Sequence, residues 1–373
     1  MGGGAYPLEG LVMDPSFWQG KNVLLTGHTG FKGSWLALWL QALGAKVTGL
    51  ALAPHTTPNL FDEAVSGARG ICSIIGDIRE PNEVATACEA AQPEIVFHLA
   101  AQALVRFSYQ QPVDTFGTNV MGTVNVLDSA RHAATVRAIV VVTSDKCYAN
   151  REWCWAYREE DSMGGHDPYS ASKGCTELVT ASYRDAFFKG RHGAGVATAR
   201  AGNVIGGGDW AEDRLIPDIV RALIRQEKVQ IRNPHAIRPW QHVLEPLAGY
   251  LLLAERLYRE PEAYAEPWNF GPAETGSVTV GEISDFLMAR WPHAPGWSRD
   301  AAAHPHETHC LRVDAAKART RLGWSPQLDA QEALDWTIDW YARHHAAESD
   351  PLALVMEQID RYTARQKGEA LLR

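Results

Sequence analysis

The sequence predicts an α/β protein built on a doubly wound parallel sheet, with a smaller α/β region after it. From about residue 21, short continuous apolar runs alternate with longer amphipathic stretches, and a glycine-rich turn at 27–33 follows the first run. The character of the chain changes after residue 205. Continuous apolar runs, in place of apolar–polar alternation, indicate strands that helices cover on both faces.

Six apolar runs predict the strands of the sheet, and the amphipathic stretches between them predict its helices. We expect strands at 22–27, 46–52, 71–77, 94–100, 138–144 and 195–205. We expect helices at 31–45, 81–92, 112–133 and 168–189. In the first helix, Trp35, Leu36, Trp39, Leu40 and Leu43 recur at helical spacing, which places them on one side.

The chain after Gly206–Gly208 has shorter and more mixed elements. We expect a helix at 214–226, a short strand at 229–232 and a last helical stretch at about 327–345. The predicted organisation is a disordered tail at 1–16, a dinucleotide-binding domain at 17–205 and a region at 206–373 that mainly binds substrate. That region should pack over the carboxyl edge of the sheet, where ligands of open α/β sheets bind.

Composition and charge exclude several classes of protein. The 373 residues are 46% hydrophobic, enough for a large core, and the net charge of −9 argues against a nucleic-acid surface. No apolar run approaches the roughly 18 residues of a membrane span, and the N-terminus lacks the pattern of a signal peptide. Six cysteines without C-x-x-C spacing suit a reducing cytosol, so we expect a cytoplasmic protein. His304, His306 and His309 lack the neighbouring ligands of a metal site, and we predict none.

The stretch TGHTGFKG places Gly27, Gly30 and Gly33 between the first strand and the first helix. Glycine allows a sharp turn, close approach of a pyrophosphate and tight packing of helix on strand, and the helix N-terminus attracts an anion. In this strand–turn–helix setting the motif predicts a Rossmann-type dinucleotide site. The cofactor-binding residues of the loop are expected to be Gly27, Thr29, Gly30, Phe31, Lys32 and Gly33.

The choice between NAD and NADP is weakly determined by the residues. The second strand leads into LALAPHTTPNLF, which has no acidic residue for the NAD ribose until Asp62 and no Arg or Lys for a 2′-phosphate. Because this segment has no cation for a 2′-phosphate, it favours NAD over NADP. Asp77 and Ile78, after the third strand, are placed to meet the adenine, although Asp77 fits a surface loop equally well.

Ser144, Tyr169 and Lys173 form a candidate catalytic set. Tyr169 and Lys173 are four residues apart on a predicted helix and share one face, while Ser144 ends the fifth strand. A neighbouring ammonium and a positive nicotinamide would lower the tyrosine pKa, so that the phenolate accepts a proton from a sugar hydroxyl as hydride leaves. Ser144 can hydrogen-bond the same hydroxyl.

The motifs FHLAAQ, TNVMGTVNVLDSAR, TSDK and YSASK resemble the extended short-chain dehydrogenases/reductases that act on nucleotide sugars. GHTGFKGSWLALWL and RPWQHVLEPLAGYLLLAE are similar to its 4,6-dehydratase branch, and the resemblance covers the chain from about residue 17. It implies a nucleotide-sugar substrate, tightly bound NAD, a homodimer or dimer of dimers built on helices 112–133 and 168–189, and a role in deoxysugar and O-antigen biosynthesis. It adds Leu99, Ala100, Ala101 and Gln102 to the cofactor site.

The resemblance also assigns roles to Asp145 and Lys146. Dehydration needs an acid for the leaving C6 hydroxyl and a base for the C5 proton, and Asp145 is the expected acid. Lys146 departs from the glutamate of many dehydratases and either acts as the base or stabilises the enolate. The alternatives are a 4-epimerase, a dehydratase of another nucleotide hexose and a non-catalytic dinucleotide sensor. Asp145 argues against the epimerase, and the intact set of Ser144, Tyr169 and Lys173 argues against the sensor.

Several residues further along match positions that bind the nucleotide sugar in the family. The expected substrate contacts are Arg106, Asn203, Arg214, Leu215, Arg238 and Asn269, with Arg238 as the diphosphate clamp because the guanidinium fork suits phosphate oxygens. His98 lies inside an apolar strand, which predicts a hydrogen-bonded core histidine.

Overall fold

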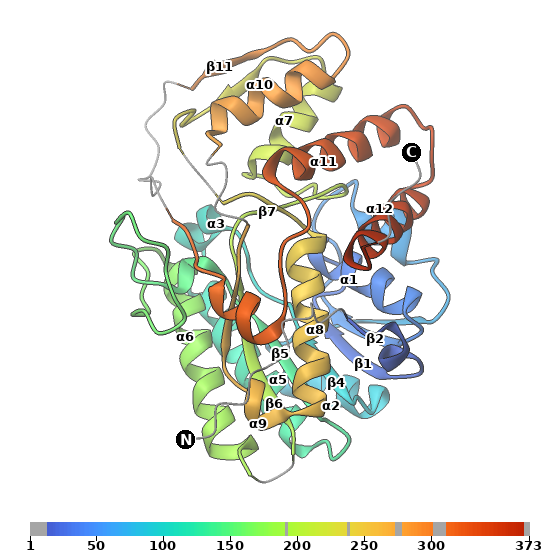
Figure 1. Ribbon diagram of the computed structural model, residues 1–373, viewed down its shortest axis with the longest axis vertical. Helices are drawn as coiled ribbons and strands as arrows, with labels where there is room; N and C mark the ends of the chain where they lie inside the picture. The colour runs from blue at the N-terminus through green and yellow to red at the C-terminus, as the bar shows by residue number, and fades with distance from the viewer. Residues whose placement is uncertain (1–12, 191–192, 237–238, 273–277, 301–310, 369–373) are drawn as a thin grey trace.

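The computed structural model describes residues 13–190, 193–236, 239–272, 278–300 and 311–368 (Figure 1). A seven-stranded sheet in the order β10-β6-β5-β4-β1-β2-β3 forms the centre, and its neighbouring strands pair in parallel. The strands are β1 Asn22–Thr26, β2 Lys46–Ala51, β3 Ile71–Ile75, β4 Ile95–His98, β5 Ala138–Val142, β6 Gly195–Ala201 and β10 Pro267–Phe270. The strand order reverses between β1 and β4, which places a ligand crevice at their carboxyl ends.

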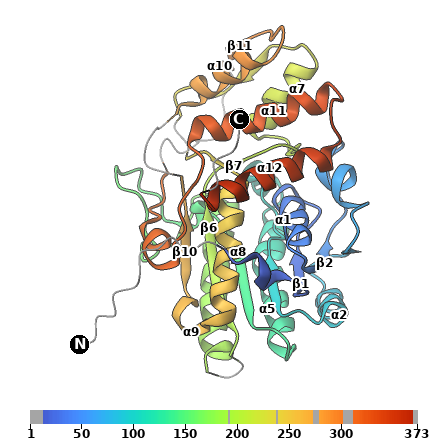
Figure 2. The same ribbon diagram turned by 45° about the vertical axis from the view of Figure 1, so that its right-hand side comes forward.

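Helices cover both faces of the sheet and create two apolar cores (Figures 1 and 2). One face carries α2 Pro81–Ala91, α5 Gly122–His132 and α6 Pro168–Tyr183, which pack against one another. The other carries α1 Phe31–Ala42 and α8 Leu244–Arg259, with α9 Pro261–Tyr264 beside β6 and α12 Pro351–Gln366 against α1. None of the described helices has both the length and the apolar composition needed to cross a membrane.

A second layer of elements lies over the carboxyl edge of the sheet (Figure 2). It contains α7 Leu215–Ile224, α10 Val280–Arg290 and α11 Ala330–His345, with two small parallel sheets. In these, β7 Val204–Ile205 pairs with β9 Gln241–His242, and β8 Val229–Ile231 pairs with β11 Trp297–Arg299. We call this layer the cap.

The remaining helical segments are short. They are α3 Val105–Gln110, α4 Pro112–Phe116, the 3-10 turns η1 Pro15–Trp18 and η4 Asp145–Cys147, and the π-helical turns η2 Phe61–Val65, η3 Gly117–Met121, η5 Arg184–Phe188 and η6 Ala318–Leu322. The expected helix at 112–133 is therefore continuous but wider in its middle turn, where η3 joins α4 to α5.

The predicted fold class is confirmed, but residue 205 does not separate two spatial units. Strand β10 pairs with β6, and α8 packs on β5 and β6, so part of the C-terminal half completes the sheet. The sequence analysis missed both elements, as well as α10 and α12. β10 has four residues and begins with proline, which hides a strand pattern, and the helix of 327–345 is followed by α12 rather than being the last.

The expected tail at 1–16 also needs correction. Residues 1–12 lie outside the described ranges, but Met13 and Trp18 are buried in the larger core. The backbone N–H of Asp14 donates to Glu255 Oε2 at 3.0 Å, and the Asp14 carboxylate pairs with Arg259 at 2.9 Å. Residues 13–16 are therefore part of the fold and pack against α8.

Candidate active site

A cavity of about 860 Å³ opens at the carboxyl edge of the sheet, below the cap. Its walls come from the turn after β1, the ends of β2 to β6, the first turns of α6, residues 201–219 and β8. It brings together most of the predicted site residues, namely Gly27, Thr29, Gly30, Phe31, Lys32, Gly33, Asp77, Ile78, Leu99, Ala100, Ala101, Gln102, Arg106, Ser144, Asp145, Lys146, Tyr169, Lys173, Asn203, Arg214 and Leu215.

The glycine turn has the geometry that a dinucleotide requires. Gly27 has φ +81°, and a Cβ there would lie 2.7 Å from the backbone nitrogen of Ala100. A Cβ at Gly33 would lie 2.0 Å from the carbonyl oxygen of Gly27. Gly30 is the N-cap of α1 and has no side chain to cover the first N–H groups of the helix. The backbone cradle therefore fits the pyrophosphate of NAD.

The loop after β4 is held by buried hydrogen bonds. The backbone N–H groups of Leu99 and Ala100 donate to the carbonyl and hydroxyl oxygens of Thr26, and that of Gln102 donates to Asn119 Oδ1 at 2.8 Å. His98 lies between Thr26 and Thr123, at 2.7 and 3.0 Å, and burial lowers its pKa to about 3. The predicted core histidine is confirmed, and it fixes the strand end beside the glycine turn.

At the far end of the cavity Asp77 pairs with a neighbour on its own loop. Arg79 donates to Asp77 from its side chain and its backbone, and it also forms an ion pair with Asp114. The segment after β2 offers no Arg or Lys for a 2′-phosphate, but Arg79, which follows β3, lines this end of the cavity. Two carboxylates already neutralise it, which keeps the environment suited to NAD.

Ser144 and Asp145 stand where β5 ends and η4 begins. Ser144 Oγ accepts the backbone N–H of Lys146 at 3.2 Å, which caps η4, and donates to Asp145 Oδ1 at 2.9 Å. The Asp145 side chain is buried, so it is not part of a solvated surface pair. A Cβ at Gly202 would lie 3.2 Å from Asp145 Oδ2, and glycine there leaves room for the carboxylate.

Tyr169 and Lys173 lie on the first two turns of α6, facing the same cavity. Asp167 caps this helix by accepting from the backbone N–H and hydroxyl of Ser170, and Pro168 occupies its first turn. Lys173 Nζ donates to the carbonyl oxygen of Val142 at 3.3 Å. Tyr169 lies close enough to Ser144 and Asp145 for both to shift its pKa, so both residues lie on the Tyr169–Lys173 side of the sheet.

Burial raises the pKa of Tyr169 to about 12, although the Ser144 hydroxyl acts in the opposite direction. The predicted lowering of this pKa includes the charge of the nicotinamide, so it stays a prediction. Burial also lowers the pKa of Lys173 to about 8, which Glu177 and Cys147 oppose. Desolvation outweighs the opposing effects of Ser144 and the Arg214 charge, so the protein alone keeps a neutral phenol, and a phenolate needs further positive charge.

Cations gather between the glycine turn and the cap. Burial lowers the pKa of Lys32 to about 7, and the charges of Arg214 and Lys173 add to this effect. Arg214, at the N-cap of α7, pairs with Asp209 at 2.9 Å. Farther out, Asp213 pairs with Arg106 at 3.1 Å and with Arg232 at 2.8 Å. This arrangement suits a diphosphate that passes between sheet and cap.

The sequence analysis missed several lining residues. Asp209, Trp210, Asp213, Arg232 and Trp240 face the cavity from segments that follow Gly206–Gly208 or lie in the cap. The glycine run was interpreted only as a break in the chain, although loops at the carboxyl edge of an open α/β sheet commonly carry ligand-binding residues.

One predicted substrate residue does not line the cavity, and another lies outside the described residues. Asn269 is fully buried and away from the cavity: its side chain accepts from Tyr148 Oη at 2.7 Å and donates to the carbonyl oxygens of Tyr157 and Asp314. Asn269 lies within β10, which was not predicted, and its hydrogen bonds join this strand to Tyr148, Tyr157 and Asp314. Arg238 lies outside the described residues, as do His304, His306 and His309. Within the described ranges, no three His, Cys, Asp or Glu residues gather as a metal site.

The fold, glycine cradle and Ser–Tyr–Lys set define a dinucleotide-dependent enzyme of the short-chain dehydrogenase type. Residues 23–266 match the NAD dependent epimerase/dehydratase family, and the chain belongs to this family. The predicted family and its dependence on NAD are therefore confirmed.

Three individual proteins are similar to this chain over most of its length. The chain is 52% identical over 334 residues to CDP-glucose 4,6-dehydratase from Salmonella typhimurium, covering 88% of this chain and 93% of that protein. Among solved structures, Epimerase Mth375 from Methanothermobacter thermautotrophicus matches with TM-score 0.80 and 24% identity, over 95% of this chain and 99% of that one. DesIV, a dTDP-glucose 4,6-dehydratase from Streptomyces venezuelae with NAD and TYD bound, matches with TM-score 0.72 and 25% identity, over 88% and 99%.

Proposed function

We propose that the protein converts CDP-glucose into CDP-4-keto-6-deoxyglucose by an internal oxidation, dehydration and reduction with NAD. The observation that carries this proposal is the buried Asp145 carboxylate beside Ser144 on the Tyr169–Lys173 side of the sheet. The 52% identity to a CDP-glucose 4,6-dehydratase supports the nucleotide and the sugar. An epimerase has no use for an acid at this position, because it expels no water.

The first step removes hydrogen from C4 of the hexose. The C4 hydroxyl lies between Ser144 and Tyr169; Tyr169 takes its proton, and Lys173 stabilises the resulting charge. NAD would accept the hydride from C4 and supply it again to C6, and the positive charge of its ring would lower the pKa of Tyr169. The residues of the glycine turn and of Leu99–Gln102 would hold it.

The second step eliminates water across C5 and C6. The C4 ketone makes the C5 proton acidic; that proton leaves, and Asp145 donates a proton to the departing C6 hydroxyl. Lys146 Nζ lies 6.0 Å from the centre of the Tyr169 ring, on the cavity wall. Lys146 either takes the C5 proton or stabilises the enolate. Hydride addition at C6 and a proton at C5 complete the product, so one water is lost overall.

The nucleotide diphosphate lies against the cation group between sheet and cap. Arg214, Leu215 and Asn203 line this part of the cavity, and Arg106 approaches it from α3. Charge-assisted hydrogen bonds from guanidinium groups suit phosphate oxygens. Arg238 remains a proposed clamp on sequence grounds alone. Residues 206–373 thus supply most of the substrate contacts.

The assembly is a homodimer through the outer faces of the helices at 112–133 and of α6. Val113 on α4 is 85% exposed, Leu178 on α6 63% and Met121 on η3 53%, and large exposed apolar side chains on neighbouring helical segments favour burial against a second copy. The five described cysteines, Cys72, Cys88, Cys147, Cys154 and Cys175, are free thiols, which suits the cytosol. The product is a precursor for deoxysugars such as those of O-antigen.

The substrate assay separates this function from its alternatives. Purified protein with NAD is incubated separately with the cytidine, thymidine, uridine and guanosine diphosphate esters of glucose. Product is followed by the ultraviolet absorbance of a 4-keto sugar in alkali. We expect this signal with CDP-glucose and deuterium incorporation at C5 in heavy water. A C4 isomer without the signal would identify an epimerase, preference for another nucleotide would change the substrate, and binding without any product would indicate a sensor.

A further inference from the structure

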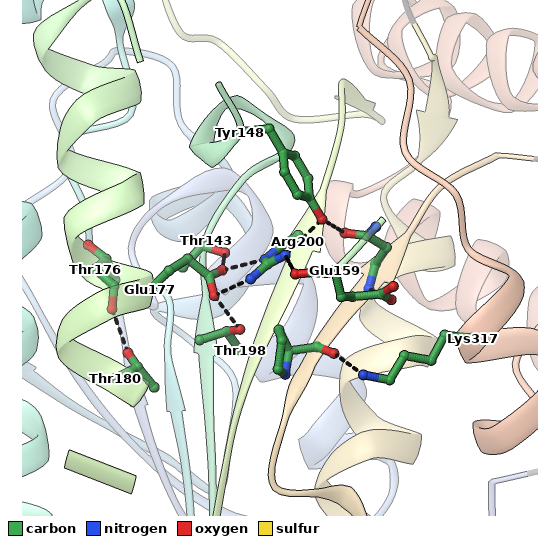
Figure 3. Close-up of polar contacts among 11 residues, drawn as sticks. Thr143, Tyr148, Glu159, Thr176, Glu177, Thr180, Thr198, Arg200 and Lys317 are labelled. Atoms are coloured by element: carbon green, nitrogen blue, oxygen red, sulfur yellow. Dashed lines mark hydrogen bonds and ion pairs between the residues drawn. The ribbon is translucent and has the colours of Figure 1, made fainter. Parts of the chain in front are cut away.

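A buried ion pair joins the catalytic helix to the strand beside it (Figure 3). Glu177 lies one turn beyond Lys173 on α6, and Arg200 lies on β6. Arg200 Nε donates to Glu177 Oε1 at 2.9 Å and Nη2 donates to Oε2 at 2.8 Å, a two-point contact. The two side chains are 2% and 5% exposed. Neither residue is part of the mechanism above.

The Glu177 carboxylate also holds the strand that ends in Ser144. Thr143 donates its hydroxyl to Glu177 Oε1, and Thr198 donates to Oε2 at 2.7 Å. Thr143 immediately precedes Ser144. Both carboxylate oxygens therefore accept a hydroxyl and a guanidinium nitrogen, and β5, β6 and α6 meet at one charged group.

Arg200 holds the other end of the same catalytic segment. Its Nη1 donates to Tyr148 Oη at 2.8 Å and to the carbonyl oxygen of Glu159 at 3.0 Å, and the guanidinium lies 5.0 Å from the centre of the Tyr148 ring. Tyr148 follows η4 and in turn donates to Asn269. Glu177 thus contacts residue 143 and Arg200 contacts residue 148, with Ser144, Asp145 and Lys146 between them.

Stability alone does not explain a pair of this kind. Removing two charges from water has a high desolvation cost, and well-packed apolar replacements for buried pairs are often neutral or stabilising. Here the bonds converge on the short segment that carries the proposed acid and the hydroxyl partner of Tyr169. Their geometry fixes where that segment stands relative to α6.

The pair also contributes to the electrostatics of Lys173. Titratable groups around Lys173 are Tyr169 and Glu177 on α6, Asp145 and Cys147 on η4, Lys32 on α1 and His98 on β4. Burial keeps Cys147 and His98 neutral near pH 7, because it raises the thiol pKa and lowers the imidazole pKa. Glu177 raises the pKa of Lys173, against the effect of burial.

We propose that Glu177 and Arg200 are positioning residues of the reaction, which hold segment 143–148 in register with the Tyr169–Lys173 face of α6. This inference rests on the proposed function. It assigns two effects to Glu177, one on geometry through Thr143 and Thr198 and one on the charge of Lys173, and only the geometric effect to Arg200.

The test compares variants in the NAD-loaded enzyme with CDP-glucose. Glu177→Gln should lower kcat by about 100-fold with little change in KM, as expected when reacting groups are misplaced by about 1 Å. The alkaline limb of the kcat profile should move to lower pH, because loss of the negative charge lowers the pKa of Lys173 further. Glu177→Asp should restore the pH profile and part of kcat. Glu255→Gln, a buried carboxylate on α8 that bonds Asp14 outside the cavity, is the matched control and should leave both unchanged.

Two milder variants test the same inference if Glu177→Gln does not fold. Thr143→Val and Tyr148→Phe each remove one hydrogen bond from opposite ends of the segment, and thermal unfolding reports their folding. We expect each to lower kcat several-fold without moving the alkaline limb, because the Glu177 charge remains. Wild-type kcat in both variants, or an unchanged kcat and pH profile in folded Glu177→Gln, would overturn the inference. Failure of the wild-type enzyme to dehydrate CDP-glucose would instead overturn the proposed function.

Discussion

The two ends of the cavity are built in different ways. At the catalytic end, Ser144, Asp145, Tyr169 and Lys173 are buried and arise from central strands and the helix beside them. At the other end, where we propose that the adenosine binds, Asp77 and Arg79 belong to the loop after β3, an edge strand, and their partner Asp114 is partly exposed to solvent. Packing in the core fixes the side chains at the catalytic end, whereas solvent-screened surface charges hold those at the other end. Variants at the catalytic end should therefore have far larger effects.

Tyr169→Phe should give the largest loss. Removing the hydroxyl that takes the C4 proton should lower the rate of cofactor reduction by roughly 1000-fold, within the range of general acid–base catalysis. Single-turnover absorbance of reduced nicotinamide after mixing with CDP-glucose measures this step. Because the ring remains, unfolding temperature and NAD binding should change little. Reduction at the wild-type rate would remove Tyr169 from the chemistry.

Asp145→Asn should separate the second step from the first. We expect reduction of NAD to persist while 4-keto-6-deoxy product forms about 100-fold more slowly, so that reduced cofactor accumulates. The measurement follows nicotinamide absorbance and alkali-developed product in the same sample. Lys146→Met is the companion variant, since loss of a base would stop deuterium exchange at C5 but loss of an enolate stabiliser would only slow it. Water loss at the wild-type rate in Asp145→Asn would refute the acid role.

The same contrast explains how far the sequence could predict the molecule. Apolar runs identify buried strands, and a parallel sheet brings their carboxyl ends together, so Gly27, Ser144 and Lys173 could be placed from pattern alone. The cap has short strands and no comparable pattern. Asp209 was missed there, and Asn269, assigned to substrate from the family resemblance, lies in β10, a strand that was not recognised. The raised Tyr169 pKa depends on burial depth, which residue types alone do not specify.

Lys32 lies between the two ends and should make cofactor binding depend on pH. Its pKa is about 7, so it is protonated below that value and loses charge above it. The diphosphate of NAD stays ionised throughout, and its affinity should therefore fall by about 10-fold as pH rises from 6 to 8, for a contact of roughly 1.4 kcal/mol. Fluorescence titration with NAD measures this. Lys32→Met should bind weakly at both pH values, and an unaltered pH dependence in that variant would assign the effect to another group.

Asp77→Asn should have the smallest effect of the series. Its partners are partly exposed, and surface ion pairs contribute about 0–1 kcal/mol, so NAD affinity should change by less than about fivefold. The change also releases Arg79 from one of its two carboxylates, which should raise the affinity for NADP relative to NAD. Parallel titrations with both cofactors test this, and Asp114→Asn is the matched control, since it frees the same guanidinium without altering residue 77. A loss of NAD affinity near 100-fold that is confined to Asp77→Asn would mean that this carboxylate holds the adenosine directly, and the adenosine end would then be as firmly specified as the catalytic one.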